Sequence, residues 1–328
     1  MNNLYPLKFA PICKDKIWGG NKLNELLNKQ YPQLPNCGES WELSGIQGDI
    51  SVVSNGFLEG NDLEELIEVY MGDLVGEKVY EKFGTEFPLL IKFIDANDYL
   101  SIQVHPNDEL ALERHDAFGK TEMWVVIQAD SGSKLITGFN RKITKEQYLD
   151  HLNKGTVEDV LNYEVVKAGD VFFMPAGRIH AIGKGIVVAE IQQTSDVTYR
   201  IFDFNRVDAD GNLRELHNDL ALDAIDFSYH STYRTAYQSI DNQPVRLAEC
   251  PYFTTNILPL TATVDRDFTD QDTFVIYMCI EGQGQLDWDG QKIEFVLGDT
   301  LLIPAQLGSF SLSAAAGTKA NLIEIYIA

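Results

Sequence analysis

Two segments of this 328-residue chain repeat one short pattern, and this repeat limits what the chain can fold into. Residues 167–182 read KAGDVFFMPAGRIHAI, and residues 296–311 read VLGDTLLIPAQLGSFS. In each copy a Gly-Asp pair, Gly169-Asp170 or Gly298-Asp299, precedes a short apolar run that ends at Pro-Ala. A glycine turn followed by a short apolar run is typical of a β-strand entered from a tight turn. The repeat therefore predicts two similar β units in one chain.

The rest of the chain also favours strands over helices. Short apolar or alternating runs recur between Gly, Pro, Asn and Asp residues, at 88–95, 100–105, 123–128, 170–174, 186–192, 274–280, 292–296 and 300–303. Many short strands separated by polar turns indicate a mainly β sandwich or barrel. A few helices are expected between them, after Asp62, at Asn107 or Asp108, and at 144–152 and 214–222.

The repeat resembles the second half of the cupin motif, so the chain is similar to double cupin proteins, which contain two jelly-roll β-barrels. The two copies differ in their polar residues, because His180 in the first falls opposite Ser309 in the second. The segment 273–280 of the second copy also carries no carboxylate or imidazole. We therefore expect the second copy to keep the fold and to lack the polar site of the first.

The polar stretch at 237–244 is the expected domain boundary. Residues 1–240 would form a metal-binding catalytic cupin domain with helical insertions, and residues 241–328 a degenerate, metal-free cupin domain. We expect the second barrel to be filled by apolar side chains such as Phe274, Ile276, Leu301 and Ile303.

The charge balance excludes several classes of partner. The chain holds 26 Lys and Arg against 49 Asp and Glu, for a formal net charge of −23. A chain this acidic repels nucleic acids and anionic membranes, so we expect neither as a partner. A small anionic ligand would need a local group of Lys and Arg side chains, because the overall field opposes its binding.

The cysteines and the hydrophobic pattern favour a cytoplasmic protein. The four cysteines form no Cys-x-x-Cys pair and are too few for a disulfide framework, so we expect free thiols in a reducing compartment. The first 20 residues hold no continuous apolar run of the kind found in signal peptides. No window of about 18 apolar residues could span a membrane. The oligomeric state is not indicated by the sequence.

One polar strand face points to a functional site. In the segment 100–105, Ser101, Gln103 and His105 alternate with Ile102 and Val104. Side chains alternate between the two faces of a strand, so the three polar residues share one face. A polar face opposite an apolar one usually lines a polar cavity.

Glu122 and His180 are the candidates to join His105. A carboxylate inside a barrel must be paired, hydrogen-bonded or metal-bound. Two imidazoles, one carboxylate and an amide oxygen from Gln103 suit a divalent metal ion with an open position, and the absence of thiolates excludes a closed structural zinc site. On spacing alone, core histidines and an ordinary ion-pair partner are an equally good interpretation.

Four cations are candidates to offset the acidic field around an anionic ligand: Lys92, Lys120, Arg200 and Arg206. The guanidinium group of arginine binds phosphate through a two-pronged fork. The alternative interpretation, of equal weight for the two arginines, is that they form surface salt bridges with the abundant acidic residues.

Six segments, in this order, resemble the type I mannose-6-phosphate isomerases in their short bacterial form. They are Trp18-Gly19-Gly20, Glu39-Ser40-Trp41, LSIQVHP at 100–106, KTEMW at 120–124, PAGRIHAI at 175–182 and SDVTYR at 195–200. The resemblance covers nearly the whole chain. It implies a double cupin, one zinc ion per chain, and a small sugar phosphate as substrate. The implied reaction interconverts mannose 6-phosphate and fructose 6-phosphate by proton transfer through a cis-enediol(ate).

The same resemblance implies roles for single residues. The implied zinc ligands are Gln103, His105, Glu122 and His180; the implied catalytic residues are Arg200, Glu190 and Lys120; and the implied substrate-binding residues are Ser101, Lys92, Trp18 and Arg206. Thr121 departs from a proline usual in the family, and Arg206 stands where some members have a lysine. The general base stays open between Glu190, Lys120 and a metal-linked water.

The implied chemistry suits these residue types. An enediolate carries negative charge on the sugar oxygens, and a cation aimed at those oxygens lowers the barrier. Two other functions remain possible. A non-catalytic sugar-binding or regulatory cupin need not keep ligands, cations and base together, and an iron-dependent cupin oxidoreductase is disfavoured by the group of cations and by the whole-chain resemblance.

Overall fold

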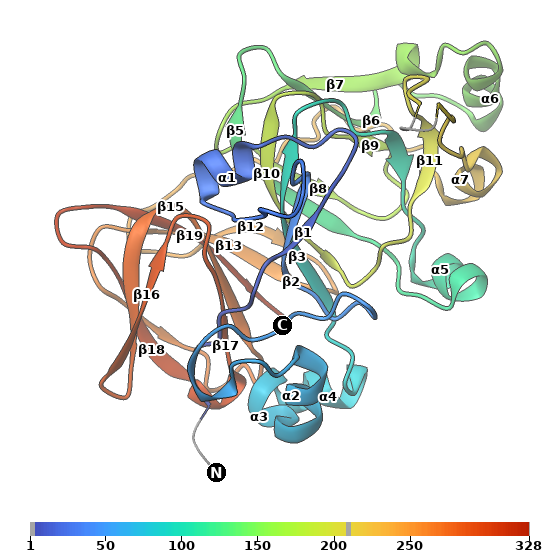
Figure 1. Cartoon of the computed structure of the whole chain (residues 1–328). Coiled ribbons are helices and arrows are strands. Elements are labelled where there is room, and N and C mark those ends of the chain that lie inside the picture. Colours follow the sequence, from blue (N-terminus) through green and yellow to red (C-terminus); the bar gives the residue numbers. More distant parts are fainter. Residues whose placement is uncertain (1–3, 208–210, 328) are drawn as a thin grey trace.

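Antiparallel strands form three sheets in the part of the chain that the structure describes (Figure 1). The computed structural model describes residues 4–207 and 211–327. In spatial order, the first sheet contains β1 (Ile12–Lys14), β2 (Glu39–Leu43), β3 (Leu89–Ala96), β10 (Ile186–Gln193), β5 (Glu122–Ala129) and β8 (Val171–Met174). The second contains β11 (Tyr199–Phe202), β4 (Ile102–Val104), β9 (His180–Ala181), β6 (Lys134–Phe139) and β7 (Leu161–Val165).

The third sheet is built from the C-terminal part of the chain. It contains β12 (Val245–Glu249), β13 (Thr254–Leu260), β19 (Ala320–Tyr326), β15 (Val275–Trp288), β18 (Ser309–Ala314) and β14 (Val264–Asp267), and β16 (Gln291–Val296) and β17 (Thr300–Ile303) also pair with β15. The expectation of a mainly β chain is confirmed.

The sequence repeat is also a repeat of hydrogen bonds. Gly169 donates its N–H to Val126 O, and Gly298 donates its N–H to Cys279 O, each at 2.8 Å. Both glycines have positive φ, +86° and +93°, which a residue without a Cβ adopts most readily. The aspartate that follows each glycine accepts a backbone N–H three residues upstream. The strand after each turn then pairs with a longer neighbour, β8 with β5 and β17 with β15.

The α-helices of the described residues are short. They are α1 (Lys22–Leu27), α2 (Leu63–Tyr70), α3 (Gly72–Val75), α4 (Glu77–Phe83), α5 (Asp108–His115), α6 (Lys145–Asn153) and α7 (Asn218–Ala224), and 3-10 helices cover Gly56–Leu58, Val157–Val160 and Ala305–Leu307. Across residues 4–207 and 211–327, no helix has the length and hydrophobicity needed to cross a membrane.

Local signals placed several helix ends correctly. Asp62 and Glu65 form a reciprocal capping box at the start of α2, and Asn107 caps α5. The apolar periodicity after Asp62 continues to Val75, but the helix breaks at Met71, whose φ is +47°. The helix expected at 214–222 begins only at Asn218, after His217.

One prediction about the second barrel is wrong. Phe274 and Ile276 do not fill its interior; they pack into the large core cluster that includes residues of the first sheet. Leu301 and Ile303 do pack in the cluster that belongs to the third sheet alone, together with Tyr277. The physical reason is strand alternation, because Phe274 and Ile276 point to the face of the strand opposite Tyr277.

The N-terminal residues cross to the third sheet. Leu7 and Leu302 exchange backbone hydrogen bonds of 2.8 and 2.9 Å, and the Nζ of Lys29 donates to Gly298 O at 2.6 Å. The third sheet begins at Val245, directly after the polar stretch at 237–244. These contacts join the two halves of the molecule, and the division at residue 240 stays a prediction.

Candidate active site

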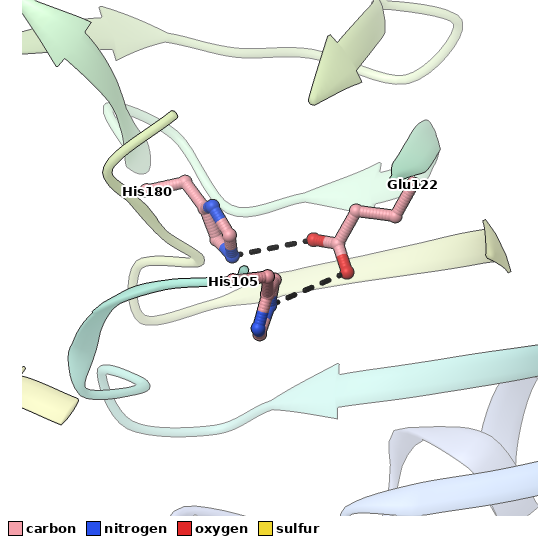
Figure 2. A group of neighbouring side chains, drawn as sticks. All are labelled: His105, Glu122 and His180. Carbon is pink, nitrogen blue, oxygen red and sulfur yellow. Dashed lines mark ion pairs between the residues drawn. The ribbon is translucent and has the colours of Figure 1, made fainter. Parts of the chain in front are cut away.

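Three buried side chains from three separate segments of the chain meet at one point (Figure 2). Glu122 begins β5 of the first sheet, His180 begins β9 of the second, and His105 directly follows β4. The Oε1 of Glu122 lies 3.3 Å from Nε2 of His180, and its Oε2 lies 3.6 Å from Nε2 of His105. The potential ligand atoms all lie within 4.8 Å of one another, and no other such group of His, Cys, Asp or Glu was found among the described residues.

Backbone carbonyls orient both imidazole rings. Nδ1 of His105 lies 2.9 Å from Val197 O, and Nδ1 of His180 lies 2.8 Å from Arg178 O. A carbonyl oxygen can only accept, so each Nδ1 carries the hydrogen and each Nε2 keeps its lone pair. This is the arrangement that metal-binding histidines use, with the second nitrogen fixed by a hydrogen bond.

Burial controls the charge of all three groups. Burial lowers the pKa of His180 to about 4 and lowers the pKa of His105 well below its ordinary value, so both rings are neutral at pH 7. Burial, reinforced by the charge of Glu190, raises the pKa of Glu122 to about 8. A cation would reverse this balance for Glu122, since it pairs with the carboxylate and binds neutral imidazole.

The same atoms are left without partners. Nε2 of His105 and both carboxylate oxygens of Glu122 are buried and accept or donate no hydrogen bond. An unpaired buried carboxylate is costly, so such groups are normally satisfied by a partner. Neutral imidazole nitrogens and a carboxylate are the ligands of catalytic divalent metal sites. The donor set therefore fits a metal ion.

A cavity of about 360 Å³ lies beside this group and is unusually rich in cations. Its cationic lining residues are Lys14, Lys16, Lys92, Lys120, Arg200 and Arg214, and its acidic ones are Glu39, Glu190 and Asp196. The cavity meets the histidine–glutamate group at Gln103, whose Nε2 lies 3.3 Å from Nε2 of His180, and at Lys120, whose Nζ lies 3.9 Å from Oε2 of Glu122. Although the net charge of the chain is −23, lysine and arginine side chains are concentrated around this cavity.

Glu190 is held in place at the wall of the cavity. Its Oε2 accepts the indole N–H of Trp124 at 2.8 Å, and its Oε1 lies 3.1 Å from the Nζ of Lys92. Burial lowers the pKa of Lys92, but Glu190 and Glu39 outweigh it, so the pKa of Lys92 is raised and the ammonium stays charged. Register explains the contacts, because Glu190 pairs with Lys92 on one side of β10 and with Trp124 on the other.

Arg200 and Arg206 differ in their surroundings. Arg200 lines the cavity on β11 beside Gln103, its Nη1 donates to Glu215 O, and its buried Nε has no partner. Arg206 is not among the lining residues; it pairs with Asp203 and donates to the carbonyl of Tyr99. The substrate-binding role expected for Arg206 stays a prediction.

The other sequence-predicted residues meet at the cavity. Trp18, Lys92, Ser101, Gln103, Lys120, Glu190 and Arg200 all line it. Lys14, Lys16, Trp41 and Arg214 also line the cavity and were not predicted as site residues. Strand alternation could not have found this set, because β1 ends at Lys14 and the chain turns between Lys16 and Gly19.

Two family models, both named for the same isomerase, match separate parts of this chain. A family model described as "Phosphomannose isomerase type I, catalytic domain" matches residues 6–122, and one described as "Mannose-6-phosphate isomerase, cupin domain" matches residues 245–326. These matches include the segments around His105 and Glu122 and the whole third sheet. They confirm the cupin fold expected from the repeat.

Individual relatives are similar to this chain over nearly its full length. The mannose-6-phosphate isomerase ManA of Bacillus subtilis is 37% identical over 317 residues, which is 95% of this chain and 96% of the relative. The mannose-6-phosphate isomerase of Streptococcus mutans is 36% identical over 93% of this chain and 94% of its own. A crystal structure of a mannose 6-phosphate isomerase from Bacillus subtilis superimposes with a TM-score of 0.85 at 30% identity, covering 98% of this chain and 99% of that one. This chain belongs to the type I phosphomannose isomerase family.

Proposed function

We propose that this protein interconverts mannose 6-phosphate and fructose 6-phosphate, with one zinc ion held by His105, Glu122 and His180. The relatives that match along the whole chain carry this activity in their names. The observation that carries the proposal is the group of unpaired buried ligand atoms beside a cavity lined by cations.

Gln103 is the proposed fourth ligand. Its Oε1 accepts only a long contact of 3.5 Å from the hydroxyl of Ser101, and its amide nitrogen faces His180. A half-turn of the amide would bring Oε1 to the side of the imidazole ligands. An amide oxygen is a weaker ligand than carboxylate or imidazole, so substrate oxygens could take its place.

Zinc suits this reaction because it polarises oxygen atoms without redox chemistry of its own, which protects an easily oxidised enediol. The chain supplies the remaining functions. The cations of the cavity attract and hold an anionic phosphate ester against the overall negative charge of the protein. Trp18, Ser101 and Lys92 are proposed to contact the sugar, and Arg206, outside the cavity wall, is proposed to bind the phosphate group.

We assign the transfer of the proton between C1 and C2 to Glu190. Its carboxylate is fixed by Trp124 and Lys92, and a general base must be held within reach of the proton it moves. Lys120 and Arg200 lie at the same cavity and would stabilise the negative charge that develops on the sugar oxygens. Lys120 can also pass a proton between the two oxygens.

A product assay in heavy water tests this proposal. Purified protein supplied with mannose 6-phosphate should form fructose 6-phosphate, and the product should carry solvent deuterium, because a carboxylate that holds the proton exchanges it. Glu190→Gln should lower kcat by about 10²–10⁴-fold. Binding of the sugar phosphate without any turnover would instead identify a non-catalytic sugar-binding cupin.

The compartment is also a proposal. The four cysteines are free thiols, as expected in a reducing compartment. We propose the cytoplasm, where phosphorylated sugars are formed and used.

A further inference from the structure

The carboxylate of Asp108 joins three separate parts of the chain. Its Oδ1 accepts the N–H of Gly119 at 2.9 Å and the Nε2–H of Gln193 at 2.8 Å, and its Oδ2 accepts the hydroxyl of Tyr252 at 2.7 Å. Asp108 is the first residue of α5, close after His105, and Tyr252 lies between β12 and β13 of the third sheet. One side chain is thus hydrogen-bonded to the loop that follows α5, to the end of β10, and to the connection between β12 and β13 of the third sheet.

Gln193 extends this connection to the strand that begins with Glu122. Its Oε1 accepts the N–H of Thr121 at 2.9 Å, and its own backbone N–H donates to Thr121 O at 3.2 Å. Gln193 is buried, and it ends β10, the strand that carries Glu190. The amide group therefore ties the segment with Lys120 and Glu122 to the strand with Glu190.

The backbone is closely packed between Gly119 and Asp108, although the side chains of Asp108, Gln193 and Tyr252 also line a cavity of about 380 Å³. A Cβ added to Gly119 would lie 2.5 Å from the backbone nitrogen of Asp108, so the two backbones are in direct contact. Lys120 donates its backbone N–H to Pro106 O at 3.1 Å, and the hydroxyl of Thr121 accepts the N–H of Ala176. A change at Asp108 would therefore be transmitted directly to Lys120 and Glu122.

From this geometry we infer that Asp108, Gln193 and Tyr252 are positioning residues, through which the third sheet fixes the catalytic segment 120–122. The inference rests on the proposed function for its kinetic readout. It gives the C-terminal domain a role in the reaction, although no residue of that domain lines the cavity in the described parts of the chain. Displacement of a catalytic group by about 1 Å can cost about 10²-fold in rate.

Asp108→Ala removes all three hydrogen bonds. At saturating zinc we expect kcat to fall by about 10–100-fold, the range seen when groups that orient metal ligands are lost. KM should stay within about threefold, because the cavity cations Lys14 and Arg200 lie on β1 and β11, away from the segment 120–122. Glu109→Ala is the matched control, since it removes an exposed carboxylate from the same turn of α5.

Asp108→Asn should restore most of the rate. The amide oxygen can still accept from Gly119 and Gln193, and the amide nitrogen can donate to the hydroxyl of Tyr252. Tyr252→Phe should lower kcat by about two- to tenfold. Its matched control is Tyr163→Phe, which breaks a hydrogen bond of 2.8 Å from tyrosine to Glu158 at the surface.

A double variant and hydrogen exchange complete the test. Tyr252→Phe combined with Asp108→Ala should be no slower than Asp108→Ala alone, because the tyrosine acts through the aspartate. Amide exchange of the 117–123 segment should rise in both single variants and stay unchanged in the controls. The inference would be overturned if the rate losses of the two variants were additive, or if amide exchange of the 117–123 segment were unchanged. It would also be overturned if folded, zinc-loaded Asp108→Ala protein kept the wild-type kcat. A wild-type protein without isomerase activity would contradict the proposed function instead, and the exchange measurement would still decide on the positioning.

Discussion

At the scale of single residues, burial and partners decide which histidines and acids can do chemistry. His105 and His180 are almost completely buried, with one nitrogen fixed by a carbonyl and the other turned to Glu122. His151 has the same functional group but lies on α6 and bonds to Thr156 of its own loop. His105 and His180 differ from His151 because strands surround them in the folded protein. The identity of a single residue in the sequence does not reveal such surroundings.

Arg200 provides the most direct kinetic test at this scale. Its buried Nε has no partner, and no carboxylate neutralises its side chain in an ion pair among the described residues. If the guanidinium stabilises charge that appears only at the enediolate, Arg200→Ala should lower kcat by about 10²–10³-fold and leave zinc content unchanged. Steady-state kinetics with metal analysis check this.

Arg206→Ala serves as the comparison, because Arg206 lies near Arg200 in sequence but off the cavity wall. A phosphate-binding role for Arg206 would raise KM with kcat nearly kept. An Arg200→Ala enzyme with wild-type kcat would contradict the assignment of Arg200.

Glu39 makes stability depend on pH. Burial raises the pKa of Glu39, but the charges of Lys92 and Lys16 outweigh it and lower the pKa to about 2. A carboxyl whose folded pKa is depressed contributes stability above its ordinary pKa, and this contribution is lost as the pH falls towards 2. Glu39→Gln should therefore be less stable than wild type by about 1–3 kcal/mol at pH 6, and the gap should narrow below about pH 5 and close near pH 2. Urea unfolding across this range measures it, and a gap independent of pH would exclude the ion pairs as its source.

At the scale of elements, alternation along strands was the most informative pattern. It placed Ser101 and Gln103 on the cavity and Ile102 and Val104 in the core. It also explains the error at Phe274, because alternation shows which residues share a face and not which face meets the other domain. The cavity itself could not be predicted, since its walls come from strands whose neighbours are set by the sheet order.

Gly298 tests the repeated turn as an element. Its φ is +93°, and an added Cβ would lie 2.5 Å from the carbonyl oxygen of Leu27. Gly298→Ala should therefore lower the free energy of unfolding by about 2–4 kcal/mol, through backbone strain and this collision. Gly290→Ala is the control, because Gly290 also has positive φ, +76°, but no atom lies within 4 Å of its added Cβ. Equal losses in the two variants, measured by denaturant unfolding, would show that the Leu27 contact is unimportant.

At the scale of the whole molecule, the two halves share one core. The largest core cluster combines residues of the first sheet, such as Ile91, with residues of the third sheet, such as Ile323. The backbone pairing of Leu7 with Leu302 adds a second connection. The repeat in the sequence predicted two β units, but the contacts that join them were not visible in it.

A shared core predicts one unfolding transition. Separation of the halves would expose the apolar side chains of Phe274 and Ile276, so neither half should remain folded when the other unfolds. Differential scanning calorimetry of the zinc-loaded protein should give a single peak whose calorimetric and van't Hoff enthalpies agree. Two resolved peaks would show that the halves are energetically independent.

Isomerase activity is proposed to depend on a zinc ion held by His105, Glu122 and His180. The most direct measurement combines elemental analysis with turnover of mannose 6-phosphate on one sample, before chelation, after chelation and after zinc is returned. We expect about one zinc per chain, loss of metal and activity together, and recovery of both in wild type but not in His105→Ala. Full turnover by protein shown to be free of metal would contradict it.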